Sequence, residues 1–343
     1  MLEEDCSTPP SDDAPAGRGS RGSRSWRARH RVAPLGVAGV AAVVMLSGVV
    51  YLAPQGVGNP AGQAVAGGTT GSEAAGGTVP GGTPSPTAVP PPAVPAVVQV
   101  DGPPGGGDGW TQVFGDEFDG AVIDRGTWRV NRYGGRGDDG AFNPSAEGAY
   151  YSPANVGVEN GCAYLEIRPD PAVVEGTSYT HSSGMLSSQG ALELEDGDYV
   201  EARVWIPSGD GLWPAFWTLP DDRWPPETDI FELFDTSIQD RPTFVYHFPD
   251  EPGVVGRRTG AVYGAPTTDY RDSWHTYGML RSNGVLVPYV DGVAYPDQGV
   301  PAGADALPQF LVLNLAVYAG KQPVAGTRML IDWVRVWYPA GPG

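Results

Sequence analysis

Short segments of alternating apolar and polar residues dominate the chain from about Asp108 onward. They are rich in β-branched and aromatic residues, and Gly, Pro, Asn and Asp separate them. None shows a convincing 3.6-residue period, so the pattern predicts strands rather than helices. The dipeptides Asn283-Gly284 and Asp291-Gly292 are typical of tight β-hairpins. We therefore expect an all-β sandwich of about 230 residues. Its clearest strand segments are 199–206, 244–248, 274–280, 285–295, 310–318 and 329–338.

The region before this domain has a different character. Residues 1–31 are polar and end in a run of arginines, whereas residues 32–53 are apolar and carry no charge. Such a segment is long enough to cross a hydrocarbon core of about 30 Å. Arginines before it predict a cytoplasmic N-terminus, a single transmembrane segment and an extracellular remainder, which makes this a cell-membrane protein. A cleaved signal segment followed by secretion is the alternative, and the small residues at 61–64 keep it open.

Residues 54–107 are rich in Gly, Pro, Ala, Thr and Val. They have no periodicity and almost no large side chains to bury, which predicts a linker. The whole chain holds 50 Gly and 35 Pro, a composition that approaches that of partly disordered proteins. The expected organisation is a basic cytoplasmic tail at 1–31, an anchor or signal segment at 32–53, a linker at 54–107 and one folded domain at 108–340.

The charge limits the partners of the folded domain. The formal net charge of the chain is −19 at pH 7. Binding of nucleic acid needs clustered Lys and Arg, so no nucleic-acid partner is expected. An acidic exterior suits a neutral substrate, although it serves solubility equally well.

Residues 227–232 read Glu-Thr-Asp-Ile-Phe-Glu and place three acids in one predicted strand. Residues two apart share a face of a strand, so Glu227 and Asp229 point the same way. Strict alternation would place Glu232 in the core, where an unpaired charge is costly. A β-bulge at Ile230-Phe231 would return Glu232 to the acidic face and leave the apolar pair to the core. Such bulges are enriched beside active sites.

Three carboxyls on one face repel one another, so their pKa values should be pushed apart. Retaining glycoside hydrolases need this asymmetry. One carboxylate attacks the anomeric carbon, and one protonated carboxyl delivers a proton to the leaving oxygen. An exposed acidic strand without function would have the same spacing, so the neighbouring residues decide between the two interpretations.

Two tryptophan-containing stretches precede the acids. Residues 211–220 read Gly-Leu-Trp-Pro-Ala-Phe-Trp-Thr-Leu-Pro, and Trp224-Pro225-Pro226 lies directly before Glu227. This assembly closely resembles the core of family 16 glycoside hydrolases, the laminarinase-like clan. The chain departs from the family pattern at Thr228 and at Leu233-Phe234-Asp235, and residues 143–151 only loosely resemble the family's substrate-binding segment. Other stretches similar to the family follow in the expected order at 113–120, 155–161, 274–277, 289–292, 314–316 and 331–337, so the resemblance covers about 110–339.

The resemblance implies a concanavalin A-like β-jelly-roll sandwich and a retaining endo-glycoside hydrolase. Carried over residue by residue, Glu227 is the nucleophile, Asp229 assists it, and Glu232 is the acid/base. The implied partner is a β-linked polysaccharide, foremost a laminarin-like β-1,3-glucan, bound by a monomeric catalytic domain. The alternatives are a β-galactan or agarose hydrolase, a transglycosylase, and a non-catalytic carbohydrate-binding wall module.

Five residues are candidates for contacts with the sugar. Trp213 and Trp217 offer flat apolar faces on which sugar rings stack, although tryptophan in a sandwich more often belongs to the core. His247 matches a cleft histidine in many relatives, although a lone histidine is more often structural. Arg132 and Asn143 lie in a loop region and offer hydrogen bonds to sugar hydroxyls.

No cofactor is expected for catalysis, because the histidines and cysteines show no metal-ligand spacing. The resemblance implies a structural Ca²⁺ held by Glu117, Asp332 and a backbone oxygen near Gly161, and oxygen ligands suit this ion. Paired surface acids without a metal are the alternative. Asn314 is expected to hold backbone near the cleft.

Overall fold

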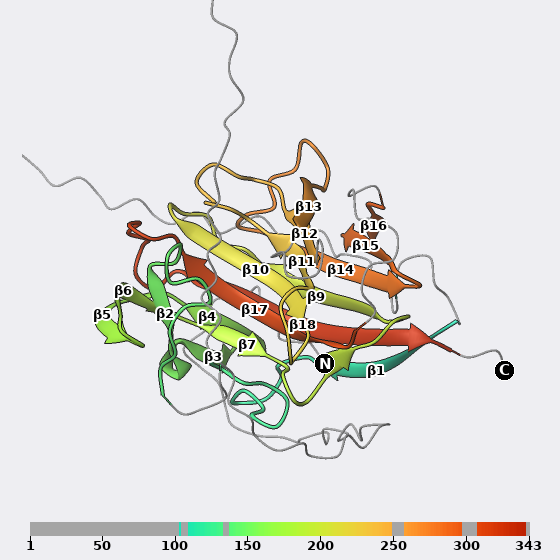
Figure 1. Ribbon diagram of the computed structural model, residues 1–343, viewed down its shortest axis with the longest axis horizontal. Helices are drawn as coiled ribbons and strands as arrows, with labels where there is room; N and C mark the ends of the chain where they lie inside the picture. Colours follow the sequence, from blue (N-terminus) through green and yellow to red (C-terminus); the bar gives the residue numbers. More distant parts are fainter. Residues whose placement is uncertain (1–102, 104–108, 133–136, 249–256, 297–306, 341–343) are drawn as a thin grey trace, which may run out of the picture. The chain divides into compact units, whose positions relative to one another are not determined.

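The structure is a computed structural model that describes residues 103, 109–132, 137–248, 257–296 and 307–340 (Figure 1). The expected tail at 1–31 and the anchor or signal segment at 32–53 lie outside the described residues, as does the linker at 54–107 except for Pro103. Over the described part of the chain, no helix has the length and apolar character to span a membrane. These residues form an antiparallel β-sandwich whose single helical element is the 3₁₀ turn η1, Pro153–Asn155.

One sheet of the sandwich has eight strands in the described residues. Its order is β16-β15-β14-β9-β18-β4-β3, and β1 pairs with the far half of the long strand β18 (Figure 1). The strands are β1 (Trp110–Asp116), β3 (Val156–Glu159), β4 (Cys162–Glu166), β9 (Tyr199–Trp205), β14 (Trp274–Ser282), β15 (Val285–Val290), β16 (Val293–Ala294) and β18 (Arg328–Pro339). We call this the outer sheet.

The second sheet has seven described strands in the order β13-β12-β11-β10-β17-β7, with β8 also paired to β17. They are β7 (Met185–Ser187), β8 (Glu193–Leu194), β10 (Leu212–Leu219), β11 (Glu227–Glu232), β12 (Thr243–Phe248), β13 (Arg257–Val262) and β17 (Gln309–Val317). We call this the acidic sheet, because β11 carries the three acids. A small third sheet contains β2 (Ala149–Tyr151), β5 (Arg168–Val174) and β6 (Thr177–Ser183).

The predicted hairpins lie where their turn residues indicate. Asn283-Gly284 joins β14 to β15, and Asp291-Gly292 joins β15 to β16. All four residues have φ between 49° and 75°. Positive φ at both central residues is the type I′ geometry, whose twist matches that of the flanking strands. The segment expected at 285–295 is therefore two strands around a two-residue turn.

The main hydrophobic core lies between the two large sheets, and alternation along the strands decides which residues enter it. On β9 the inward residues are Val200, Ala202 and Val204, and on β17 they include Leu311 and Leu313. Across the interface, the ring of Phe231 on β11 lies 4.3 Å from that of Tyr277 on β14, centroid to centroid. The strand that carries the acids is thereby fixed to the opposite sheet.

The other face of the acidic sheet carries a second, smaller apolar cluster. Phe310 and Val312, which alternate with the core residues of β17, pack there with Tyr151, Met185, Ala215 and Trp217. Strand β17 is therefore buried on both faces along its whole length. The second cluster borders the acids, because Trp217 on β10 is the register partner of Asp229 on β11.

Candidate active site

Strand β11 contains the β-bulge that its sequence predicts. Against β12, Asp229 pairs with Val245 and Glu232 with Thr243, so three steps on β11 match two on its neighbour. Against β10 the register shifts at the same place. Ile230 and Phe231 are fully buried and belong to the main core. The predicted bulge is confirmed, and the apolar pair takes the place in the core that strict alternation would have given to Glu232.

The three acids meet distinct partners on the face opposite the core. The indole Nε1 of Trp213 donates to Glu232 Oε1 at 2.8 Å. The indole Nε1 of Trp224 donates to Glu227 Oε2 at 3.1 Å. Asp229 and Glu232 are only 4% and 8% exposed. Each glutamate is therefore held by an indole N–H, and the two differ in what surrounds them.

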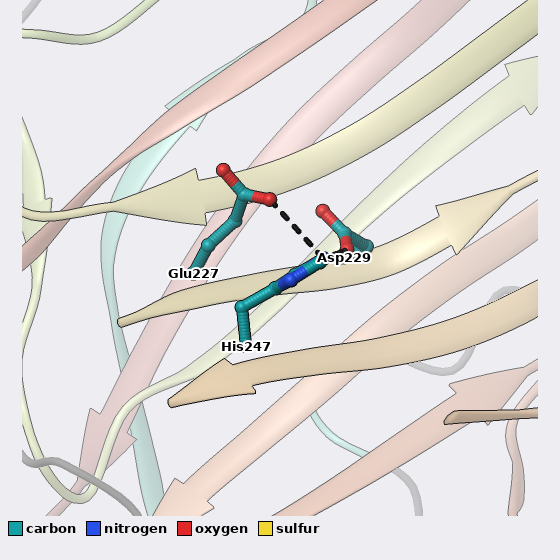
Figure 2. Close-up of side chains that lie close together, drawn as sticks. All are labelled: Glu227, Asp229 and His247. Carbon is teal, nitrogen blue, oxygen red and sulfur yellow. Dashed lines mark ion pairs between the residues drawn. The ribbon is translucent and has the colours of Figure 1, made fainter. Parts of the chain in front are cut away.

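His247 lies directly beside the first two acids, as Figure 2 shows. It is the register partner of Glu227 on the adjacent strand β12. Its Nε2 is 3.4 Å from Glu227 Oε1 and 3.3 Å from Asp229 Oδ2. The predicted cleft position of His247 is therefore next to the two acids at the start of β11.

Burial and neighbouring charges shift the pKa of Glu227. Burial raises the pKa of the Glu227 carboxyl to about 8, and the charge of Asp229 is the next largest cause. His247 acts in the opposite direction, and Glu232 adds a smaller upward contribution to the pKa of Glu227. Neighbouring carboxyls cannot all ionise at neutral pH, so the group retains a proton.

Trp213 lies in an aromatic group at one end of the acids. Its ring stacks on Tyr318 with a centroid distance of 4.9 Å and an interplanar angle of 12°. Phe234 lies 5.6 Å away from it in a tilted arrangement. One face of the Trp213 ring is therefore occupied by protein. Its clearest role in this geometry is to hold Glu232, and the prediction that it stacks on sugar remains a prediction.

Trp217 begins a chain of hydrogen bonds that runs away from the acids. Its indole Nε1 donates to Asn314 Oδ1 at 2.7 Å, and Asn314 Nδ2 donates to the hydroxyl of Tyr151 at 2.9 Å. The Tyr151 hydroxyl donates to Glu147 Oε2 at 2.8 Å. The other oxygen, Oε1, accepts from the backbone N–H of Asn143 at 2.6 Å. We call these residues the Glu147 chain.

The Glu147 chain ties a loop to the sheet that carries the acids. Glu147 is 5% exposed. Burial raises the pKa of its carboxyl to about 7, although the hydrogen bonds from Asn143 and Tyr151 favour the charged form. Asn314, expected to hold backbone near the cleft, instead links two aromatic side chains, Trp217 and Tyr151.

Arg132 serves the same loop. Its Nη1 donates to the backbone oxygens of Gly140 at 2.9 Å and Ala141 at 2.6 Å. Its guanidinium lies over the ring of Phe142, 5.3 Å from the centroid, and that ring packs edge-on against Trp217. Arg132 thus shapes the loop, and its predicted contact with sugar hydroxyls stays a prediction, as does that of Asn143.

The residues expected to hold Ca²⁺ lie near the same stretch of β18 in the outer sheet. Both oxygens of Glu117 accept from Arg335, at 2.9 and 2.8 Å. Asp332 is paired with Arg203, and Gly161 occupies a turn with φ of 76° between β3 and β4. With a guanidinium on each carboxylate, this arrangement matches the paired-acid alternative more closely than an ion site. The calcium prediction remains untested.

Sequence reasoning did not assign a role to Glu147, Tyr151 or Trp224. Trp224 was visible only as part of the resemblance, and nothing in the spacing marked it as a partner of Glu227. Glu147 precedes β2 and Tyr151 ends it, and the hydrogen bond from Asn314 to Tyr151 spans 163 residues. No local pattern in the sequence marks this connection.

Comparisons with known proteins agree with this geometry. No protein-family model matches the chain. An endo-1,3-1,4-β-glycanase of Rhizobium meliloti (strain 1021) is 29% identical over 249 residues, which cover 66% of this chain and 51% of that protein. The chain thus spans about half the length of the curated relatives it matches first.

Solved structures match over most of their own length. An endo-β-1,3-glucanase from Pyrococcus furiosus has a TM-score of 0.57 and 25% identity, covering 73% of this chain and all of that one. A non-specific endo-β-1,3(4)-glucanase from glycoside hydrolase family 16 has a TM-score of 0.56 and 28% identity, covering 69% and 97%. Together with the three acids on the bulged strand, these likenesses support a laminarinase-like assignment to glycoside hydrolase family 16.

Proposed function

We propose that the described domain is a retaining endo-glycoside hydrolase on a jelly-roll sandwich, and that it cleaves β-1,3-glucan. The observation that carries the proposal is the bulge of β11, which brings Glu232 to the face that Glu227 and Asp229 already occupy. Double displacement at an anomeric carbon needs two carboxyls beside the scissile bond, and here two glutamates share one face.

The two glutamates have separate roles in the reaction. Glu227 attacks the anomeric carbon while Glu232 gives its proton to the leaving glycosidic oxygen, so a glycosyl-enzyme ester forms and one sugar chain departs. Glu232, now a carboxylate, takes a proton from water, and the water oxygen displaces Glu227 from the anomeric carbon. Both groups then have their starting protonation, and the β configuration is retained.

Because the pKa of Glu227 is raised, the two carboxyls of Glu227 and Asp229 hold a proton between them at neutral pH. We assign this proton to Asp229. The nucleophile must be an anion when it attacks. The ligand oxygens of Glu227 and Asp229 lie within 4.8 Å of each other, so a proton can pass between the two carboxyls. With the proton on Asp229, Glu227 is anionic and its neighbour is a hydrogen-bond donor.

The two indole N–H donors support the separate roles of the two glutamates. The Trp224 N–H stabilises negative charge on Glu227. It therefore favours the second step, in which Glu227 departs from the anomeric carbon as a carboxylate. The Trp213 N–H holds one oxygen of Glu232, which leaves the other to carry the transferred proton. Each interaction orients a carboxyl without placing a formal charge beside it.

The decisive experiment measures sugar release from laminarin by the full-length chain and by Glu227→Ala and Glu232→Ala. We expect both variants to lose activity, and Glu159→Ala, which removes an exposed acid paired with Arg328, to retain it. Azide added with an aryl β-glucoside substrate then separates the roles. It should restore turnover of Glu227→Ala with an α-glycosyl azide product, and of Glu232→Ala with a β-glycosyl azide. Full activity in both alanine variants would overturn the proposal.

The linkage is proposed from the relatives. The Rhizobium protein is described as acting on 1,3-1,4-linked glycans, and the Pyrococcus structure as a β-1,3-glucanase. A panel of laminarin, lichenan, agarose and galactan tests this choice, with laminarin expected to be cleaved fastest. Faster cleavage of agarose or galactan would favour the galactan alternative. Products longer than the starting oligosaccharide would favour transglycosylation.

We further propose that the domain lies outside the cell, anchored by the apolar segment at 32–53. Support comes from the arginines before this segment and its lack of charge. The mass of the mature protein in the membrane fraction tests this proposal. A soluble, shortened protein whose sequence begins after residues 61–64 would favour the cleaved-signal alternative.

A further inference from the structure

The cluster at the start of β11 has the composition of a metal site. One ligand atom from each of Glu227, Asp229 and His247 lies within 4.8 Å of the other two. Figure 2 shows the three side chains converging from two neighbouring strands. The register explains the convergence, because Glu227 and His247 are cross-strand partners and Asp229 lies two residues along the same face.

The two distances from His247 to the carboxylates match those between ligands around one ion. His247 Nε2 is 3.4 Å from Glu227 Oε1 and 3.3 Å from Asp229 Oδ2. Charge-assisted N–H···O bonds are shorter, about 2.7–2.9 Å. Ligand atoms of a tetrahedral Zn²⁺ with bonds of about 2.0–2.1 Å lie about 3.3–3.4 Å apart. The distances from His247 Nε2 to the two carboxylate oxygens therefore match the distance between two ligand atoms of one Zn²⁺ ion.

The donor set selects the class of ion. One imidazole and two carboxylates suit Zn²⁺ and its neighbours Cu²⁺ and Ni²⁺. Ca²⁺ and Mg²⁺ prefer shells made of oxygen alone. Three protein ligands leave a further position for water, as in open zinc sites. The side chains are mostly buried, with 15%, 5% and 19% of Glu227, Asp229 and His247 exposed, so a bound ion would be partly shielded from solvent.

We propose that Glu227, Asp229 and His247 form a binding site for a divalent transition-metal ion, with Zn²⁺ as the reference ion, and that the bound ion blocks the active site. The blocking part rests on the proposed function, because an oxygen of Glu227 that ligates the ion is withdrawn from attack on the anomeric carbon. The ion and the polysaccharide then compete for the same face of β11, which makes Zn²⁺ a reversible inhibitor.

Binding is tested on the full-length chain, stripped with a chelator, by calorimetric titration with ZnCl₂ in the absence of substrate. We expect one tight Zn²⁺ per chain and at least about tenfold weaker binding in both His247→Gln and Asp229→Asn, the scale that metal-site substitutions produce. CaCl₂ in large excess should not displace the Zn²⁺. Thermal melting of each variant confirms that the chain is folded.

A matched control is present in the outer sheet. The Nδ1 of His275 lies 2.7 Å from Asp291 Oδ2, so it is also a histidine paired with an acid. His275→Gln should leave the tight Zn²⁺ site unchanged. Tight binding that survives in folded His247→Gln, or that is lost in His275→Gln, would overturn the proposal. So would displacement of Zn²⁺ by Ca²⁺.

Inhibition is measured separately, with laminarin as the substrate. Zn²⁺ should raise KM and leave kcat unchanged in the wild-type chain, with half-inhibition near the dissociation constant from calorimetry. Binding without any cleavage of laminarin would refute the proposed glucanase function alone. Cleavage of laminarin without Zn²⁺ binding would refute the metal site alone.

Discussion

Two largely buried glutamates on neighbouring layers of the sandwich have opposite electrostatics. Glu166, on β4 of the outer sheet, has its pKa lowered, first by a hydrogen bond from Arg168 and then by Arg328 against the effect of burial. Glu227, on β11 of the acidic sheet, has its pKa raised by burial and by Asp229. The side chains are 11% and 15% exposed. The exposed fractions are similar, but desolvation is the largest cause only at Glu227, whereas hydrogen bonds from two arginines lower the pKa of Glu166.

A third acid shows that the sheet itself is not the cause. Glu201 lies on β9 of the outer sheet and accepts from the Tyr199 hydroxyl at 3.0 Å. Burial raises the pKa of its carboxyl to about 7. An acid held by guanidinium groups contributes to stability as an anion, whereas an acid whose burial outweighs its hydrogen bonds resists ionisation. Glu227 belongs to the second kind, so its ionisation lowers the stability of the folded chain.

The largest expected difference between the two glutamates is in activity. Glu227→Gln should lower kcat on laminarin by about 10⁴-fold or more, because the amide cannot form the glycosyl ester. Glu166→Gln should leave kcat within a few-fold of the wild type. Initial rates at saturating laminarin measure both variants. Equal losses would mean that the two acids are not functionally distinct.

The second difference is in the free energy of unfolding, which the two substitutions should change in opposite directions. Glu166→Gln removes an anion bound by Arg168 at 2.7 Å and Arg328 at 2.8 Å, and should cost about 1–2 kcal/mol of unfolding free energy at pH 7. Glu227→Gln removes a buried acid that resists ionisation and should raise the unfolding free energy at pH 9. Denaturant unfolding measures both, and destabilisation by both substitutions would break the comparison.

The pH dependence of these stabilities follows from the two pKa shifts. Glu227 titrates near its usual pKa of 4.5 when unfolded and at about 8 when folded, so ionisation costs stability as pH rises between these values. The gain from Glu227→Gln should therefore vanish at pH 4 and be complete at pH 9. Glu166, with its lowered pKa, stabilises above pH 4.5, so the cost of its substitution should disappear in acid. Melting curves from pH 3.5 to 9 measure both trends.

A smaller effect is expected at the indole that holds the acid/base. Trp213→Phe keeps a ring beside Tyr318 but removes the N–H that donates to Glu232. We expect kcat to fall about tenfold and the alkaline limb of the pH–rate profile to move, because the carboxyl loses a donor that favours its charged form. An unchanged profile would leave Trp213 with a packing role alone.

The smallest expected effect concerns the Glu147 chain. Glu147→Ala removes the acceptor of the Asn143 N–H and the Tyr151 hydroxyl, so the loop loses its tie to the sheet. KM for laminarin should rise about three- to tenfold while kcat changes little, and Glu147→Gln, which keeps an acceptor oxygen, should restore part of the loss. A fall in kcat without a change in KM would contradict this role.

Local sequence patterns predicted the features of the fold that depend on neighbouring residues alone. The Asn283-Gly284 and Asp291-Gly292 turns follow from the φ values that these residues tolerate. The bulge at Ile230-Phe231 follows from the cost of burying Glu232. The cross-strand position of His247, the stacking of Trp213 on Tyr318 and the Glu147 chain depend on register between distant segments. No local pattern encodes that register, so only the fold shows them.

The configuration of the first product tests the central claim most directly. Proton NMR of laminarin oligosaccharides during the first minutes of cleavage by the full-length chain shows which anomer forms before mutarotation. A bulge that places Glu227 and Glu232 on one face for double displacement predicts the β anomer first, followed by slow appearance of the α anomer. The α anomer first would mean direct displacement by water and would contradict the assignment of Glu227 as nucleophile.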